Sequence, residues 1–98
     1  MPVAVILDFP GGTLDQYDQI LEKMGFTKGG PLNAEGGMSH WVAATDNGIR
    51  VSDLWRSRED FDAFAKDKIG PLTAEVGMTQ PEMTVYEVHN YLVGTADA

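Results

Sequence analysis

Three residues that could form a reactive site lie in the middle of the chain: His40, Asp53 and Trp55. A histidine beside a carboxylate is a candidate general base or hydrogen-bond donor, because imidazole titrates near neutral pH. An indole can supply a flat apolar wall for a substrate. We therefore name His40 and Asp53 as candidate catalytic residues and Trp55 as a candidate substrate-binding residue.

The spacing of these residues places their side chains on one face of a predicted β-hairpin. Residues 38–46 and 49–55 read as strands joined by Asn47-Gly48, a sequence typical of tight hairpin turns. A two-residue loop there gives the following cross-strand pairs: Asp46 with Ile49, Ala44 with Val51, Val42 with Asp53, and His40 with Trp55. A shift of two residues would keep His40, Asp53 and Trp55 on a shared face. The alternative is a satisfied polar pair at the sheet margin beside an ordinary core tryptophan.

His89 and Tyr86 are further candidates for substrate contact, and both fall in the last predicted strand, residues 83–92. No short turn fixes the register of that strand, so the sheet face of His89 stays open. The two histidines of the chain show no His-x-His or His-x-x-x-His spacing. We therefore predict no metal site.

The remaining elements follow from hydrophobic periodicity and capping residues. Residues 3–9 form an apolar run that predicts a buried strand. Thr13 and Gln16 have capping-box spacing at the start of a first helix, and Gly25 is a suitable residue to end it. Ser57 begins a second helix, which Gly70-Pro71 is expected to break or kink.

The element order β-α-β-β-α-β predicts an α+β, ferredoxin-like domain with a four-stranded antiparallel sheet and both helices on one face. Another small α+β sandwich is the alternative. We expect one domain over residues 1–93 and a flexible tail over residues 94–98.

The strands carry apolar residues on both faces, although two helices can cover only one. In the hairpin, Val42, Val51 and Trp55 occupy one face, and Trp41 and Leu54 the other. Packing of two identical sheets face to face would bury the uncovered face. The sequence therefore predicts a homodimer.

Composition restricts the partners. The 98 residues carry a formal charge of −8 and no cysteine. Such an acidic surface repels nucleic acid, and the first apolar run is too short to span a membrane. The absence of cysteine suits a reducing compartment. We expect a cytoplasmic protein that binds neither nucleic acid nor membrane.

Residues 51–64, VSDLWRSREDFDAF, combine a strand, a tryptophan, a Ser/Glu/Asp cap and an aromatic-rich helix. This segment, the following Gly70-Pro71-Leu72 and the last strand resemble antibiotic-biosynthesis-monooxygenase-like members of the dimeric α/β barrel superfamily. The resemblance implies a homodimeric barrel with an apolar pocket between sheet and helices, in which cofactor-independent oxygenation of aromatic metabolites can occur. It also implies that Trp55 is a pocket residue.

Two departures argue against heme degradation, an activity of another branch of this superfamily. Residues 57–77 contain no histidine to ligate heme iron, and residues 3–9 lack the asparagine of that branch. We therefore expect no cofactor. The leading hypothesis is a cofactor-independent monooxygenase-like enzyme acting on a small apolar or aromatic metabolite. The alternatives are a non-catalytic module that binds a small lipophilic ligand, and a purely structural dimer.

Overall fold

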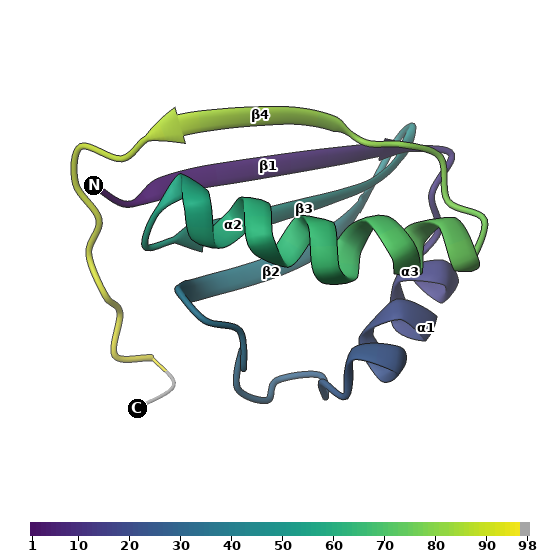
Figure 1. The fold of residues 1–98 in the computed structure, drawn as a ribbon, viewed down its shortest axis with the longest axis horizontal. Coiled ribbons are helices and arrows are strands. Elements are labelled where there is room, and N and C mark those ends of the chain that lie inside the picture. Colours follow the sequence, from purple (N-terminus) through teal and green to yellow (C-terminus); the bar gives the residue numbers. More distant parts are fainter. Residues whose placement is uncertain (97–98) are drawn as a thin grey trace.

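The computed structural model describes residues 1–96, in which a four-stranded antiparallel sheet carries its helices on one face (Figure 1). The elements in chain order are β1 (Val3–Pro10), α1 (Leu14–Met24), β2 (Gly37–Thr45), β3 (Gly48–Trp55), α2 (Arg58–Phe64), the π-helical turn η1 (Ala65–Ile69), α3 (Gly70–Glu75) and β4 (Glu82–Glu87). The strand order is β2-β3-β1-β4. The predicted ferredoxin-like α+β fold is confirmed.

Local hydrogen bonds define both ends of α1. The Thr13 hydroxyl accepts from the Gln16 backbone N–H, and the Gln16 side chain accepts from the Thr13 N–H, so the predicted capping box is present. Gly25 ends the helix with φ of 81°, a conformation that costs glycine little. These signals fix where α1 lies along the chain and hence which of its residues face the sheet.

The predicted hairpin register is wrong by two residues. The two-residue loop is Asp46-Asn47, so Thr45 pairs with Gly48, Val42 with Val51, and His40 with Asp53. Gly48 belongs to β3 because it lies against β1 opposite Pro10, where any side chain would collide with the Phe9 carbonyl oxygen. The glycine is needed for this close approach. The predicted shared face of His40, Asp53 and Trp55 survives the shift.

The second helical segment does not end at Gly70-Pro71, because a wider, π-helical turn precedes these residues and the helix then continues. Pro71 has no N–H to donate to the preceding turn. The chain forms η1 just before it, and the Gly70 N–H bonds to the Ala65 carbonyl five residues back. The expected break is therefore a π-helical turn between α2 and α3.

Strand β4 is shorter than predicted, ending at Glu87 instead of residue 92. Its one neighbour is β1, and the pairing of Val3 with Glu87 uses the first residue of β1. A last hydrogen bond joins the Val88 N–H to the Pro2 carbonyl. Beyond Val88, β1 has no further residues to pair with. His89 therefore follows the strand and does not belong to it.

The two sheet faces differ in cover. Toward the helices, alternate residues of the central strands are buried, and these make up most of the core: Val3, Val5, Leu7, Phe9, Ile49, Val51 and Trp55, together with Phe61 of α2. On the outer face Ile6 and Leu54 are half-buried, while Trp41 is 53% and Tyr86 58% exposed. The sequence predicted apolar residues on both faces of the sheet. The helices of the chain cover one face and leave the other exposed.

No helix within residues 1–96 has the length and apolar character needed to cross a bilayer. Residues 94–96 form neither helix nor strand. The rest of the predicted tail, residues 97–98, lies outside the described residues.

Candidate functional site

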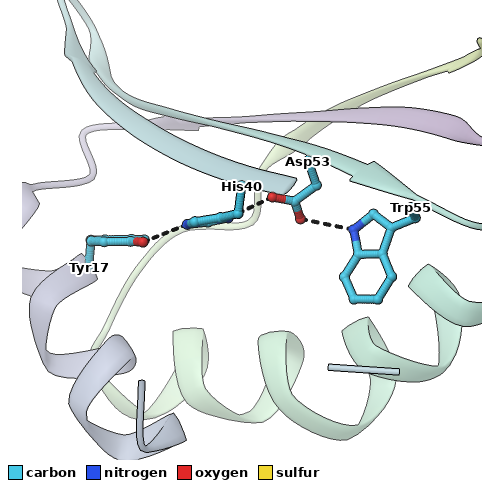
Figure 2. Close-up of polar contacts among 4 residues, drawn as sticks. All are labelled: Tyr17, His40, Asp53 and Trp55. Carbon is cyan, nitrogen blue, oxygen red and sulfur yellow. Dashed lines mark hydrogen bonds and ion pairs between the residues drawn. The ribbon is translucent and has the colours of Figure 1, made fainter. Parts of the chain in front are cut away.

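A chain of hydrogen bonds joins α1 to the middle of the sheet (Figure 2). The Tyr17 hydroxyl on α1 is 2.6 Å from His40 Nε2 on β2, and His40 Nδ1 is 2.6 Å from Asp53 Oδ1 on β3. The indole N–H of Trp55 donates to Asp53 Oδ2 over 3.1 Å. The structure thus brings together His40, Asp53 and Trp55, as the sequence predicted, and adds Tyr17.

The chemistry of the acceptors determines where the protons lie. Asp53 is 6% exposed, and as a carboxylate it can only accept, so His40 Nδ1 must carry a proton toward it. In a neutral imidazole Nε2 is then the acceptor, and the Tyr17 hydroxyl donates to it. Asp53 therefore orients the ring and leaves Nε2 as the basic atom.

Tyr17 is the member of this hydrogen-bonded group that the sequence analysis did not predict. Burial raises the pKa of its hydroxyl, and the negative charges of Asp53 and Asp18 raise it further. Tyr17 is therefore a protonated donor near neutral pH. The rings of Tyr17 and His40 are nearly parallel, with planes inclined by 10° and centroids 5.8 Å apart, and they lie end to end so that the hydroxyl points at Nε2 (Figure 2). The available sequence signal was helical spacing, which places Tyr17 on one stripe with the apolar residues Leu14, Ile20, Leu21 and Met24.

Trp55 supports the site from within the core. It is 1% exposed, and its ring packs edge-on to Phe61 and at a tilt to Phe64, with centroids 5.8 and 5.2 Å away. This packing fixes the indole N–H that holds Asp53 Oδ2. Trp55 also lines a cavity beside the site. Its contact with a substrate stays a prediction, whereas its contact with Asp53 is a feature of the structure.

Two hollows meet at Tyr17 and His40. The inner cavity, about 70 Å³, lies between α1, the helix-facing side of the sheet and the segment from α2 to α3. The outer cleft, about 650 Å³, is bounded by α1, residues 26–32 and residues 38–42 of β2. Tyr17 and His40 line both hollows. The basic nitrogen therefore lies at the boundary between a small apolar space and a larger open one.

Tyr86 and His89 are not brought to this site. Tyr86 lies on β4 with an exposed side chain, on the face away from the helices, and His89 is an exposed residue beyond the end of β4. Neither lines the inner cavity or the outer cleft. Within residues 1–96, no three His, Asp or Glu side chains lie together as metal ligands would.

The chain is similar to known proteins in its structure and not detectably in its sequence. No protein-family model matches the chain, and no curated protein matches it. Rv0793 from Mycobacterium tuberculosis matches with a TM-score of 0.67 at 21% identity, over 95% of this chain and 100% of its own. A structure from Chloroflexus aurantiacus, described as a candidate antibiotic biosynthesis monooxygenase, matches with a TM-score of 0.62 at 18% identity, over 96% and 100%.

SnoaB, described as a cofactor-independent oxygenase from Streptomyces nogalater, matches with a TM-score of 0.58 at 15% identity, over 93% of this chain and 95% of its own. At such identities the likeness concerns the fold, and it extends over nearly the whole of each chain. The resemblance that residues 51–64 indicated is thereby confirmed as a likeness of fold. The chain has the ferredoxin-like α+β fold of the antibiotic-biosynthesis-monooxygenase-like structures.

Proposed function

We propose that the protein is a cofactor-independent monooxygenase-like enzyme that acts on a small apolar or aromatic metabolite. One observation carries the proposal: the hydrogen-bonded chain Tyr17–His40–Asp53 ends at the boundary between the inner cavity and the outer cleft. A base oriented by a buried carboxylate and placed beside an open cleft is an arrangement suited to removing a substrate proton. The fold shared with SnoaB supports the same reading.

In the proposed reaction a substrate in the outer cleft gives a proton to the Tyr17 oxygen, and Tyr17 passes its own proton to His40 Nε2. The resulting imidazolium faces Asp53, whose negative charge stabilises it. The substrate carbanion is then oxidised by dioxygen. For a methylene flanked by aromatic rings, one oxygen atom becomes the new carbonyl and the other leaves as water, so that R₂CH₂ and O₂ give R₂C=O and H₂O.

Oxygen uptake with an anthrone or a quinol tests this proposal. Replacing the base should lower turnover by about 10²-fold or more, the usual contribution of a positioned general base. His40→Ala is the test variant, and His89→Ala is the matched control because the second histidine lies outside both hollows. Spontaneous oxidation is measured without protein and subtracted. Equal turnover in wild type and His40→Ala would remove His40 from the mechanism.

A non-catalytic module that binds a lipophilic ligand is the second candidate, and the volume of the outer cleft favours it. About 650 Å³ falls within the range of roughly 300–1,000 Å³ typical of small-molecule sites. A ligand that binds the folded protein but not the unfolded protein raises the melting temperature. A melting shift with an anthrone, without oxygen uptake above the protein-free rate, would favour this candidate over the enzyme.

We also propose that the protein is a homodimer in which two sheets pack through their outer faces. Trp41 and Tyr86 expose more than half of their surface there, and Ile6 and Leu54 lie between them on the central strands. The Asp8–Arg50 ion pair bounds this apolar area at the hairpin end, with 2.7 Å between Arg50 Nε and Asp8 Oδ1. A second copy of the same chain offers a matching apolar face.

A further inference from the structure

The inner cavity offers a water molecule almost nothing to bond to. Each polar side chain that lines it already has a partner. Tyr17 bonds to His40, and both His40 and the Trp55 indole bond to Asp53. The Thr73 hydroxyl donates to the Ile69 carbonyl over 2.7 Å. Every buried side-chain nitrogen or oxygen in residues 1–96 has a hydrogen-bond partner. A buried water needs two to four free polar partners, and apolar cavities without them stay dry. The inner cavity is therefore suited to an apolar guest.

The volume of the cavity restricts that guest to a very small molecule. An apolar protein cavity of about 150 Å³ accommodates benzene or xenon. The inner cavity, at about 70 Å³, is roughly half that size. A fused-ring metabolite does not fit there, whereas a diatomic gas does. The outer cleft has the volume for the organic molecule.

The two hollows share the wall that carries the base. Tyr17 and His40 line both, together with Leu21, Phe26 and Leu32. In Figure 2 the two polar side chains lie end to end between α1 and the sheet. A molecule in the inner cavity and another in the outer cleft would thus meet across this wall.

We propose that the inner cavity is a dioxygen site and that the outer cleft holds the organic substrate, so that proton removal and oxidation occur at the same wall. The assignment of dioxygen as a reactant rests on the proposed function. The capacity of the cavity for a small apolar gas does not, because it follows from volume and lining alone. The balance is that of the proposed reaction: dioxygen takes up the electrons, one oxygen atom enters the substrate, and the other leaves as water.

Xenon binding to the full-length wild-type protein tests the cavity without any turnover. In a xenon-pressurised crystal, one xenon atom should lie within contact distance of Val51 and Ile20, which line the inner cavity but not the outer cleft. Ordered waters filling the cavity, or xenon only in the outer cleft, would overturn the proposal. This readout is independent of whether any anthrone is oxidised.

Two filling variants from different elements probe the role of the gas in turnover. Val51→Ile adds one methylene from β3, and Ile69→Phe fills the space from η1 in case the strand variant misfolds. Val3→Ile is the matched control, because Val3 is as buried as Val51, at 6% against 7%, but does not line the cavity.

Each filling variant should weaken xenon binding at least threefold and raise the KM for oxygen by a similar factor, with the KM for the anthrone unchanged. Val3→Ile should change neither quantity. A rise confined to the anthrone KM would overturn the assignment of the two hollows. If the wild type binds xenon in the cavity but oxidises no anthrone, the gas site stands and the proposed function fails.

Discussion

At the scale of single residues, Asp53 holds the site together. Its buried carboxylate accepts from His40 through one oxygen and from Trp55 through the other. A buried charge is costly unless hydrogen bonds satisfy it, and here both oxygens are satisfied. The carboxylate thereby fixes both the ring orientation and the tautomer of His40.

Asp53→Asn should lower both stability and turnover. The amide has one oxygen to offer two donors, so one N–H of His40 or Trp55 loses its acceptor, at a cost of about 1–3 kcal/mol. If the amide donates to His40 Nδ1, the proton moves to Nε2 and the basic atom is lost. Urea unfolding and oxygen uptake measure the two effects, with the exposed Asp67→Asn as control. Full turnover in Asp53→Asn would show that the tautomer is not set by this carboxylate.

Tyr17 should ionise above the ordinary pKa of tyrosine, because burial and the charges of Asp53 and Asp18 oppose tyrosinate. The ultraviolet titration of wild type minus that of Tyr17→Phe isolates this group. Since the folded-state pKa is raised, the stability linked to it is complete below the unfolded value of about 10 and is lost as pH rises through the folded value. A midpoint of this difference titration at or below about pH 10 would contradict the buried hydrogen bond.

Three of the four hydrogen-bonded residues could be predicted from the sequence, because these three lie close together on one hairpin. His40, Asp53 and Trp55 belong to one hairpin, where alternation along each strand decides the face. Tyr17 belongs to a helix whose rotation and distance from the sheet are set by packing. The helical spacing of Tyr17 with apolar residues favours burial, but nothing local in the sequence could predict its contact with His40.

At the scale of elements, Gly48 fixes the register of the hairpin and therefore the pairing of His40 with Asp53. Replacing it with alanine would place a methyl group against the Phe9 carbonyl oxygen. We expect Gly48→Ala to destabilise the protein by on the order of 2 kcal/mol or more. Gly94→Ala, where an added methyl group meets nothing within 4 Å, is the control in thermal unfolding. Equal melting temperatures would mean that β1 and β3 separate at little cost.

Element boundaries were predictable where the signal is local. The capping box at Thr13 and the cap at Ser57 lie where the sequence placed them. The end of β4 was not predictable, because the apolar pattern continues past Glu87 although β1 has no further residues to pair with it. The turn was misassigned because Asn47-Gly48 suits a hairpin loop, whereas contact with β1 requires the glycine inside the strand.

At the scale of the whole molecule, the outer sheet face predicts the oligomeric state. Ile6→Asp puts a charge at the centre of that face, where it would be buried in a dimer and solvated in a monomer. Sedimentation equilibrium should give a dimer for wild type and a monomer for Ile6→Asp. Asp15→Asn on the helical side is the control, since its exposed side chain lies away from the sheet face. A wild-type monomer at high concentration would disprove the proposed interface.

The outer cleft has two walls of different construction. The proposed base, His40, and Tyr17 lie on β2 and α1, whereas residues 27–31, which also line the cleft, belong to a connecting loop with no helix or strand. Loops accept exchange and insertion far more readily than the strands beneath them. Replacing those five residues with another segment would alter which ligands enter the cleft and leave the hydrogen bonds of Tyr17, His40 and Asp53 unchanged. In the proposed enzyme, the selection of substrates and the transfer of protons therefore depend on different elements and can diverge independently.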